Sequence, residues 1–193
     1  MTLKIAIEIL KSGGVVAYST DTAYGLGADP ENKKAILKIF EIKGRSKEKS
    51  LPLIAGDLKI VKKYAKIDKV SLGLAKEFWP GPLTLVLEPT ALAKRKFVKQ
   101  IFQDGKIAIR IPDCSIARKL SKEINRPITS TSANISGEPM CYSQKQLEKQ
   151  FAGRKYKPDF ILDSGRLKKS KSSTIAEVQG DIILVWRQGR IRI

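Results

Sequence analysis

The sequence predicts an α/β fold with a single twisted sheet of mixed parallel and antiparallel strands, flanked by helices. Short apolar or β-branched runs alternate along the chain with longer segments of helical periodicity, which is typical of this class. The last two runs are separated by Gln179-Gly180-Asp181, a spacing suited to an antiparallel hairpin. No internal repeat or low-complexity linker divides the 193 residues. We therefore expect residues 1–193 to form one domain with one hydrophobic core.

The N-terminal segment MTLKIAIEILKSGG predicts an amphipathic helix. Lys4, Glu8 and Lys11 lie among its apolar residues, and it contains no small-residue cleavage site typical of a signal peptide. The longest unbroken apolar run, Ile182 to Trp186, is far shorter than the roughly 20 residues of a membrane-spanning helix. We therefore expect a cytoplasmic protein without a membrane segment.

Proline, glycine and aspartate mark the ends of three more helices. Asp29 and Pro30 predict the N-cap and first turn of a helix that buries Ala35, Ile36, Ile39 and Phe40 and ends at Gly44. The other two are predicted after Asp68 as far as Pro80-Gly81-Pro82, with Val70, Leu74 and Phe78 inward, and after Asp113 as far as Pro127, with Ile116, Leu120 and Ile124 inward.

Eight short runs have the length and composition of strands. They are Val15 to Tyr18, Leu51 to Ala55, Leu83 to Leu87, Ile107 to Ile111, Ile128 to Thr131, Phe160 to Leu162, Thr174 to Val178 and Ile182 to Trp186. Lys94 to Gln103 and Arg154 to Ser173 are polar, basic and weakly periodic, so we expect mobile surface loops there.

The composition restricts the chemistry. The chain contains no histidine, which excludes Ser-His-Asp and Cys-His catalysis and disfavours a catalytic zinc site. The two cysteines, Cys114 and Cys141, lack CxxC spacing, so we expect reduced thiols. With 37 Lys and Arg against 19 Asp and Glu, the net charge is +18. Such a surface attracts polyanions, although a lysine-rich exterior that only aids solubility gives the same composition.

Two clusters follow predicted secondary-structure elements in the first quarter of the chain. Thr20 and Tyr24 belong to STDTAYGL, directly after a strand, where open α/β sheets bind ligands; a hydrogen-bonded turn is the alternative. Lys43 and Arg45 enclose Gly44 at a helix C-terminus. Such a cation pair can neutralise a triphosphate, although cations are also stabilised there by the helix dipole.

Arg110 and the loop TSTSANISG, residues 129–137, are further candidates. Alternation places Arg110 opposite Ile109 and Ile111; its guanidinium predicts either an ion pair with a nearby Asp or Glu, or a bidentate site for a ligand carboxylate. The loop has six hydroxyl or amide side chains in eight residues and lacks a P-loop lysine. It predicts a ligand-binding loop or an ordinary hydrophilic turn.

The ordered series STDTAYGL, KGR, WPGPLT, IRIP, TSANISG, SSTI and WRQG resembles that of the YrdC-like threonylcarbamoyl-AMP synthases, from about residue 5 to residue 190. The resemblance implies a twisted α/β fold with a large basic cleft. It implies synthesis of L-threonylcarbamoyl-AMP from L-threonine, bicarbonate or CO2 and ATP, with release of pyrophosphate. This reaction is the first step of the t6A37 modification of tRNA, so the product would pass to a downstream threonylcarbamoyl-transferase complex.

The resemblance also implies roles for residues in these motifs. Lys43 and Arg45 would hold the ATP phosphates, as the residues most directly involved in catalysis, with Mg2+ as the expected metal. No residue is predicted to bind a metal directly. Further nucleotide contacts would come from Ser132, Asn134, Ser136 and Arg187, and threonine contacts from Thr20, Tyr24, Arg110 and Ser173.

The sequence departs from the family pattern in several places. Ser19 and Ser46 stand where relatives usually have proline, and Glu177 stands where they usually have aspartate. Many relatives have a histidine that contacts threonine near Leu51 to Ala55, but this chain reads SLPLIA. The additional C-terminal domain of longer relatives is not part of this sequence.

Three other functions remain open at this point. A non-catalytic module for tRNA or double-stranded RNA would use dispersed cations such as Lys94, Lys96, Lys168 and Lys169. A related carbamoyl-adenylate maturation module would share the fold. Dihydroxybutanone-phosphate synthase has a related outline, but it needs acidic residues and histidine that the sequence does not offer.

Overall fold

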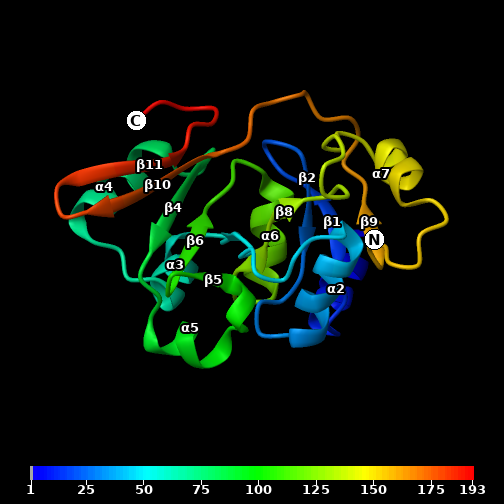
Figure 1. The fold of residues 1–193 in the computed structure, drawn as a ribbon, viewed down its shortest axis with the longest axis horizontal. Helices are drawn as coiled ribbons and strands as arrows, with labels where there is room; N and C mark the ends of the chain where they lie inside the picture. The colour runs from blue at the N-terminus through cyan, green and yellow to red at the C-terminus, as the bar shows by residue number, and fades with distance from the viewer. Residues whose placement is uncertain (1) are drawn as a thin grey trace.

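The computed structural model describes residues 2–193, which form two mixed sheets flanked by helices (Figure 1). The helices are α1 (Thr2–Lys11), α2 (Lys33–Lys43), α3 (Leu58–Tyr64), α4 (Lys69–Phe78), α5 (Ala91–Lys96), α6 (Ser115–Glu123) and α7 (Gln144–Phe151), with the 3-10 helix η1 (Lys99–Ile101). The strands are β1 (Val16–Ser19), β2 (Tyr24–Gly27), β3 (Leu53–Ile54), β4 (Leu83–Leu87), β5 (Phe102–Gln103), β6 (Lys106–Arg110), β7 (Ile128–Thr129), β8 (Thr131–Ser132), β9 (Phe160–Leu162), β10 (Thr174–Gln179) and β11 (Ile182–Arg187).

The strands divide between two sheets, where the sequence predicted one. The smaller sheet has the order β8-β2-β1-β9, and the larger has the order β11-β10-β4-β6-β3-β7, with β5 beside β6. Both contain parallel and antiparallel pairs, so the predicted mixed α/β class is confirmed. The run Ile128 to Thr131 joins the sheets, because it breaks at Ser130 into β7 and β8. The Ser130 amide donates to the carbonyl of Pro52 at 2.8 Å.

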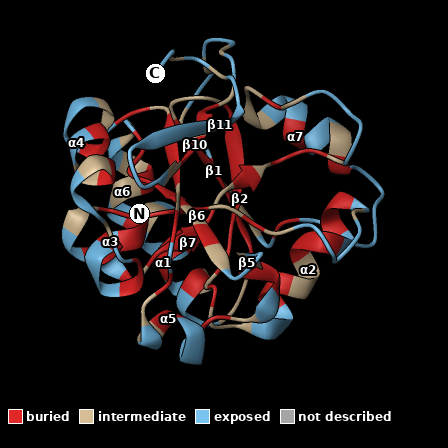
Figure 2. Cartoon of the chain, turned by 60° about the vertical axis from the view of Figure 1, so that its left-hand side comes forward, coloured by how far each residue is buried: buried red, intermediate tan, exposed pale blue. Residues whose placement is uncertain are grey.

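Two groups of buried side chains stabilise the sheets. The larger includes Phe40 of α2, Leu53 of β3 and Leu85 of β4. The smaller joins α1 and α6 to β1 and β9, with Leu10 and Leu120 fully buried. Buried residues therefore fill the centre of the molecule and exposed ones follow the outer helix faces (Figure 2).

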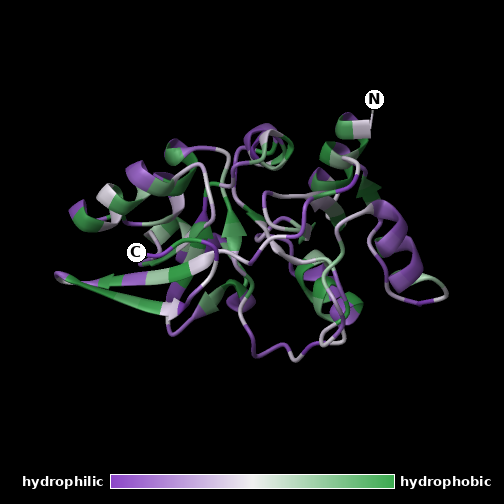
Figure 3. Ribbon diagram, turned by 90° about the horizontal axis from the view of Figure 1, so that it is seen from above, coloured by the Kyte–Doolittle hydropathy of each residue, from purple (hydrophilic) through white to green (hydrophobic). Residues whose placement is uncertain are grey.

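The hairpin of β10 and β11 is confirmed. Ile183 pairs with Val178 and Ile182 with Gln179 across the turn. Strand β11 forms the free edge of the larger sheet, and all six of its residues are exposed. The exposed strand β11 is largely apolar along its length, whereas the turn at the tip of the hairpin is hydrophilic (Figure 3).

The predicted start of α2 is wrong by three residues, whereas α6 follows Asp113 as expected. The N-cap of α2 is Asn32, whose side chain accepts from the Ala35 amide at 3.0 Å. Asp29 instead accepts from the Glu31 amide in the preceding turn and pairs with Arg126. The N-cap of α6 is Cys114, which makes no side-chain capping bond. The predicted end of α2 at Gly44 is confirmed, since Gly44 has a φ of 57° and its amide donates back to the helix.

The segment Lys94 to Gln103 is ordered, so its expected loop is a wrong prediction. It contains the end of α5, the helix η1 and strand β5, which pairs with β6. Phe97 and Ile101 are buried in the larger core, and this burial outweighs the surrounding lysines. The elements β2, α3 and α7 were not predicted from the sequence. Cys114 and Cys141 are free thiols, as expected, and among residues 2–193 no helix has the length and apolar character needed to cross a membrane.

Replacing Asp68 by alanine should destabilise the fold through α4. Asp68 is its N-cap and accepts from the amide and hydroxyl of Ser71 at 2.8 and 2.7 Å. Loss of such a cap should lower the free energy of unfolding by about 1–2 kcal/mol in urea denaturation at pH 7. Asp113→Ala, before the uncapped start of α6, is the matched control and should cost less than about 0.5 kcal/mol.

The pH dependence of this effect follows from the pKa of Asp68. Burial acts to raise that pKa, but the hydrogen bonds from Ser71 outweigh burial and lower it below its ordinary value. A carboxyl with a depressed folded pKa contributes stability that is present above its unfolded pKa of about 4 and is lost as the pH falls through the folded value. The difference between wild type and Asp68→Ala should shrink in acid; an equal difference at pH 3 and pH 7 would contradict the capping role.

Candidate ligand pocket between the two sheets

A pocket of about 490 Å³ lies between the sheets. The smaller sheet contributes β2 and β8, and the larger contributes β3, β4, β5, β6, β10 and β11. Loops complete it from the β1–β2 turn, the end of α2 and the segment before β10. This volume suits a small-molecule substrate or nucleotide.

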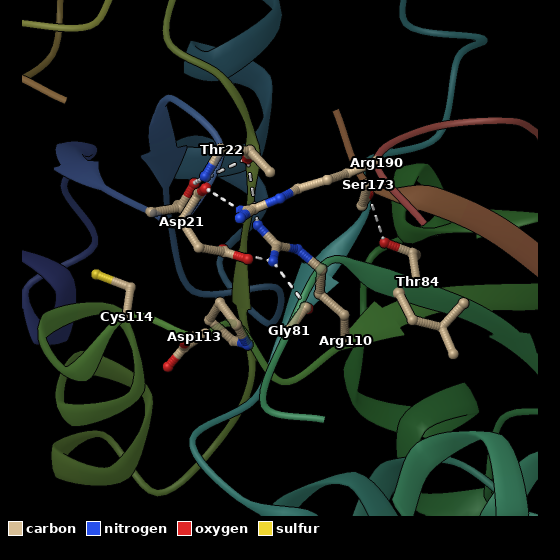
Figure 4. A network of polar contacts seen from close by, with 12 residues as sticks. Asp21, Thr22, Gly81, Thr84, Arg110, Asp113, Cys114, Ser173 and Arg190 are labelled. Carbon is tan, nitrogen blue, oxygen red and sulfur yellow. Dashed lines mark hydrogen bonds and ion pairs between the residues drawn. The ribbon is translucent and has the colours of Figure 1, made fainter. Parts of the chain in front are cut away.

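Arg110 lies at the end of β6 and contacts the β1–β2 turn (Figure 4). Its Nη1 donates to Asp21 Oδ1 at 2.6 Å and to the Gly81 carbonyl at 3.2 Å. Its Nη2 is 3.5 Å from Thr22 Oγ1, and its Nε has no hydrogen-bond partner among residues 2–193. The ion pair allowed by the sequence is therefore present on Nη1. The Nε–Nη2 edge makes the long contact to Thr22, and its geometry suits a ligand carboxylate.

Lys43 supports the TSTSANISG loop from behind. Its Nζ donates to the carbonyl of Ser132 at 2.6 Å and to the carbonyl and Oδ1 of Asn134, both at 3.0 Å. These three bonds use all three ammonium hydrogens. The carbonyl of Lys43 also accepts from the amide of Ser136 at 2.8 Å. Burial, and secondly the charge of Arg45, lowers the pKa of Lys43 to about 8.

Arg45 lines the pocket with spare hydrogen-bond donors. Its Nη2 donates to the carbonyl of Ser50 at 3.3 Å. Its Nε is buried without a partner among the described residues. A buried guanidinium N–H without an acceptor is costly, so this donor is suited to an anionic ligand.

The hydroxyls of Thr20 and Tyr24 are used within the protein. Thr20 Oγ1 donates to the carbonyl of Ala23 at 2.7 Å and accepts from the Thr22 amide, so the turn read from the sequence is present. The single hydroxyl hydrogen of Tyr24 is shared between the Gly165 carbonyl at 3.0 Å and Asp163 Oδ1 at 3.2 Å, and the hydroxyl oxygen accepts from the amide of Ser164. Burial raises the pKa of Tyr24. Both residues still line the pocket.

Ser173 and Arg187 face the pocket from the C-terminal hairpin. Arg187 donates from Nε and Nη2 to the Ser173 carbonyl at 3.1 and 2.9 Å, and from Nη2 to the Ser173 hydroxyl. That hydroxyl also bonds to Thr84 of β4 at 2.9 Å. Arg187 is thus fixed by uncharged partners.

The fold brings most of the predicted site residues to this single pocket. Lys43, Asn134 and Ser136 do not line it: the first two are buried in the loop support and Ser136 is exposed. Seven of the ten predicted residues line the pocket: Thr20, Tyr24, Arg45, Arg110, Ser132, Ser173 and Arg187.

Sequence reasoning missed several polar lining residues. Lys106 lies on the same face of β6 as Arg110, with Ala108 between them. The alternation that singled out Arg110 could have found it. Ser50 and Gln103 also line the pocket and are joined at 2.9 Å, but they come from separate segments, so no local pattern predicts them.

The fold and the pocket define an α/β protein with a ligand site that presents several cations and many hydroxyls. The chain belongs to the Sua5/YciO/YrdC family, whose sequence model, described as "Telomere recombination", matches residues 8–189.

Named relatives and solved structures agree with this assignment. The chain is 36% identical to a protein of Methanocaldococcus jannaschii named "Putative threonylcarbamoyl-AMP synthase", over 98% of this chain and 88% of that protein. It superposes on P. abyssi Sua5 in complex with L-threonine with a TM-score of 0.86 and 35% identity, covering 97% of this chain and 54% of that one. It thus spans about half the length of Sua5. E. coli YciO gives a TM-score of 0.82 at 28% identity, with 97% and 88% covered.

Proposed function

We propose that this protein synthesises L-threonylcarbamoyl-AMP from L-threonine, bicarbonate or CO2 and ATP. The observation that carries the proposal is the convergence of Arg45, Arg110 and Arg187 with Ser132 and Ser173 on one pocket between the sheets. These residues come from motifs far apart in the sequence. The name of the M. jannaschii relative supports the same activity, and the L-threonine complex of P. abyssi Sua5 supports threonine as a substrate.

The chemistry requires positioned charge. The threonine nitrogen attacks CO2 and loses a proton to give a carbamate. A carbamate oxygen then attacks the α-phosphorus of ATP, and the bond to the departing pyrophosphate breaks. Arg110 would hold the threonine carboxylate on its Nε–Nη2 edge, while Arg45 and Arg187 would stabilise charge on the phosphates. No protein nucleophile is needed, which is compatible with a chain without histidine.

The loop of residues 129–137 would orient the nucleotide. Ser132 lines the pocket directly, and Asn134 fixes the loop through its bonds to Lys43 and to the carbonyl of Glu138. Ser136 would contact the nucleotide from the exposed end of the loop. Contact between Lys43 and phosphate remains a prediction, since its three donors serve the loop carbonyls in this structure.

The residues present do not form a protein cage for magnesium. Among residues 2–193 no three His, Cys, Asp or Glu side chains are grouped to hold a metal. We propose that Mg2+ enters with ATP, held by phosphate oxygens and water, as is common for nucleotide sites. The steps above are assigned to side chains of the protein alone.

Pro52 and Leu53 line the pocket in the segment where many relatives have the threonine-contacting histidine. We propose that these apolar side chains pack against the substrate in its place. They also help to exclude water, which decomposes both the carbamate and the mixed anhydride.

The direct test is incubation of the protein with ATP, bicarbonate and each amino acid in turn. Pyrophosphate release and the adenylate, detected by mass spectrometry, should depend on threonine. Pyrophosphate release with a different amino acid would correct the substrate. No amino-acid-dependent release would overturn the function.

Arg45→Gln should weaken ATP use selectively. Loss of the guanidinium with the unpartnered Nε should raise the KM for ATP about 10- to 100-fold, while the KM for threonine stays within about twofold. Lys47→Gln, at an exposed position in the same loop, is the matched control. Steady-state kinetics with each substrate varied would show this; an equal effect on both KM values would contradict a phosphate role.

We propose that residues 1–193 act as one functional domain in the cytoplasm. We also propose that this domain contacts tRNA or double-stranded RNA. The adenylate would then pass to a threonylcarbamoyl-transferase complex. Lys168 and Lys169 are exposed in the segment before β10, which favours an RNA contact there. Arg45→Gln should leave RNA affinity and its salt dependence unchanged. Loss of RNA binding in this variant would contradict an RNA contact at dispersed surface lysines.

A further inference from the structure

Four cations line the pocket: Arg45, Lys106, Arg110 and Arg187. Among the residues that the structure describes, no Asp or Glu lines it. The four cations are nevertheless not equivalent, because their partners behind the pocket wall differ.

The two cations on β6 are each paired with a buried carboxylate. Asp21, with a side chain 6% exposed, pairs with Arg110 at 2.6 Å. Glu177 of β10, with a side chain 2% exposed, pairs with Lys106, which also lies 3.9 Å from Glu88. Each buried carboxylate has a second oxygen, Asp21 Oδ2 or Glu177 Oε2, without a hydrogen-bond partner in residues 2–193.

Glu177 neutralises Lys106 at one end of β6, and Asp21 neutralises Arg110 at the other end. Burial opposes the ionisation of Glu177, but bonds from Lys106 and Gln179 outweigh it and lower the pKa of this carboxyl. Arg190 approaches Asp21 only at its backbone carbonyl, at 3.4 Å.

The other two cations have only uncharged partners. Arg45 donates to the Ser50 carbonyl, and Arg187 donates to the carbonyl and hydroxyl of Ser173. Their charges are not compensated by an ion pair of the described chain. The pocket therefore has a neutral strand, β6, and two net positive groups outside it.

We propose that Asp21 and Glu177 are specificity-determining residues that partition charge within the pocket. By neutralising Arg110 and Lys106, they direct a polyphosphate to Arg45 and Arg187 and reserve the Arg110 edge for a single carboxylate. Polyphosphate carries several charges and is attracted mainly by net positive potential, whereas a carboxylate can be selected by bidentate geometry. The inference rests on the proposed function for the identity of the carboxylate substrate, but not for the distribution of charge.

Asp21→Asn tests the first pair, with pyrophosphate as the probe. Asparagine keeps an oxygen for Arg110 and removes the negative charge, so Arg110 should become a phosphate site. In the wild type, pyrophosphate should not compete with threonine in the binding equilibrium measured by calorimetry. In Asp21→Asn it should compete, and its affinity should rise about tenfold or more.

Glu177→Gln is the matched variant at the other end of β6. Lys106 and Arg110 are four residues apart, or roughly 13 Å along the strand. This variant should therefore strengthen pyrophosphate binding without making it compete with threonine. Asp113→Asn, which removes an exposed carboxylate with 74% of its side chain accessible, should change neither property. A folded Asp21→Asn protein that binds pyrophosphate like wild type would overturn the proposal.

A second measurement covers the case in which Asp21→Asn does not fold. The double variant Asp21→Asn/Arg110→Gln removes the ion pair as a neutral unit, so pyrophosphate affinity should stay within about twofold of wild type. Arg45→Gln and Arg187→Gln should each weaken it about tenfold. An equal loss of pyrophosphate affinity in the double variant, in Arg45→Gln and in Arg187→Gln would overturn the proposal. Because pyrophosphate binding needs no turnover, this result is independent of whether threonylcarbamoyl-AMP is formed.

Discussion

Replacing Lys43 by methionine should abolish most of the activity by releasing the loop of residues 129–137. Methionine fills similar space without a hydrogen-bond donor, so it leaves the carbonyls of Ser132 and Asn134 without their lysine partner. We expect kcat/KM for ATP to fall by about 100-fold or more, because the nucleotide contacts lose their fixed geometry. The free energy of unfolding should fall by about 2–4 kcal/mol, since buried carbonyls lose their donor.

Two comparisons make this test specific. Lys34→Met, on the exposed face of the same helix, should leave activity and stability close to wild type.

In the wild type, the Lys43 pKa of about 8 predicts that deprotonation above this pH removes one of the three N–H donors, so kcat/KM should decline there. The free energy of unfolding should change with pH in the opposite direction to kcat/KM. Because the folded pKa of Lys43 lies below its unfolded value of about 10.4, stability rises with pH between the two values. Wild-type kinetics in Lys43→Met would refute the loop-support role.

Replacing Arg110 by glutamine should have the largest effect on threonine use. The bidentate edge is lost, and kcat/KM for threonine should fall by about 1000-fold or more. The buried Asp21 carboxylate also loses its partner, so the free energy of unfolding should fall by about 3–5 kcal/mol. Substrate kinetics and urea denaturation measure the two effects separately.

The double variant Asp21→Asn/Arg110→Gln separates the two effects. It removes the stranded charge, so most of the stability should return. Threonine use should stay low, because no guanidinium is present. Recovery of threonine use in the double variant would show that Arg110 acts only by stabilising the fold.

Local patterns in the sequence were sufficient for the elements that depend on nearby residues. Gly44 ends α2 because only a residue tolerant of positive φ fits there. Asp68 caps α4 because its carboxylate reaches an amide three residues ahead. The hairpin of β10 and β11 follows from its short loop. These features need no information about the rest of the chain.

Local patterns failed where distant contacts decide the structure. The segment around Phe97 and Ile101 was expected to be a loop, but it is ordered because both side chains are buried in the larger core. The N-cap of α2 is Asn32 and not the predicted Asp29, because Asp29 pairs with Arg126 on a distant segment. Strand β2 was read as part of a turn, although its pairing with β1 and β8 defines the smaller sheet.

The sequence by itself determined the α/β class, the family resemblance and seven of the residues that line the pocket, because short motifs carry the resemblance and strand alternation identifies Arg110 as a side chain on the ligand face. Only the tertiary structure decided how those residues divide their work. It directed Lys43 to loop carbonyls, paired Arg110 with Asp21 and Lys106 with Glu177, and left Arg45 and Arg187 without acidic partners. Charge balance depends on distances between groups that are far apart in the chain, and composition does not contain those distances.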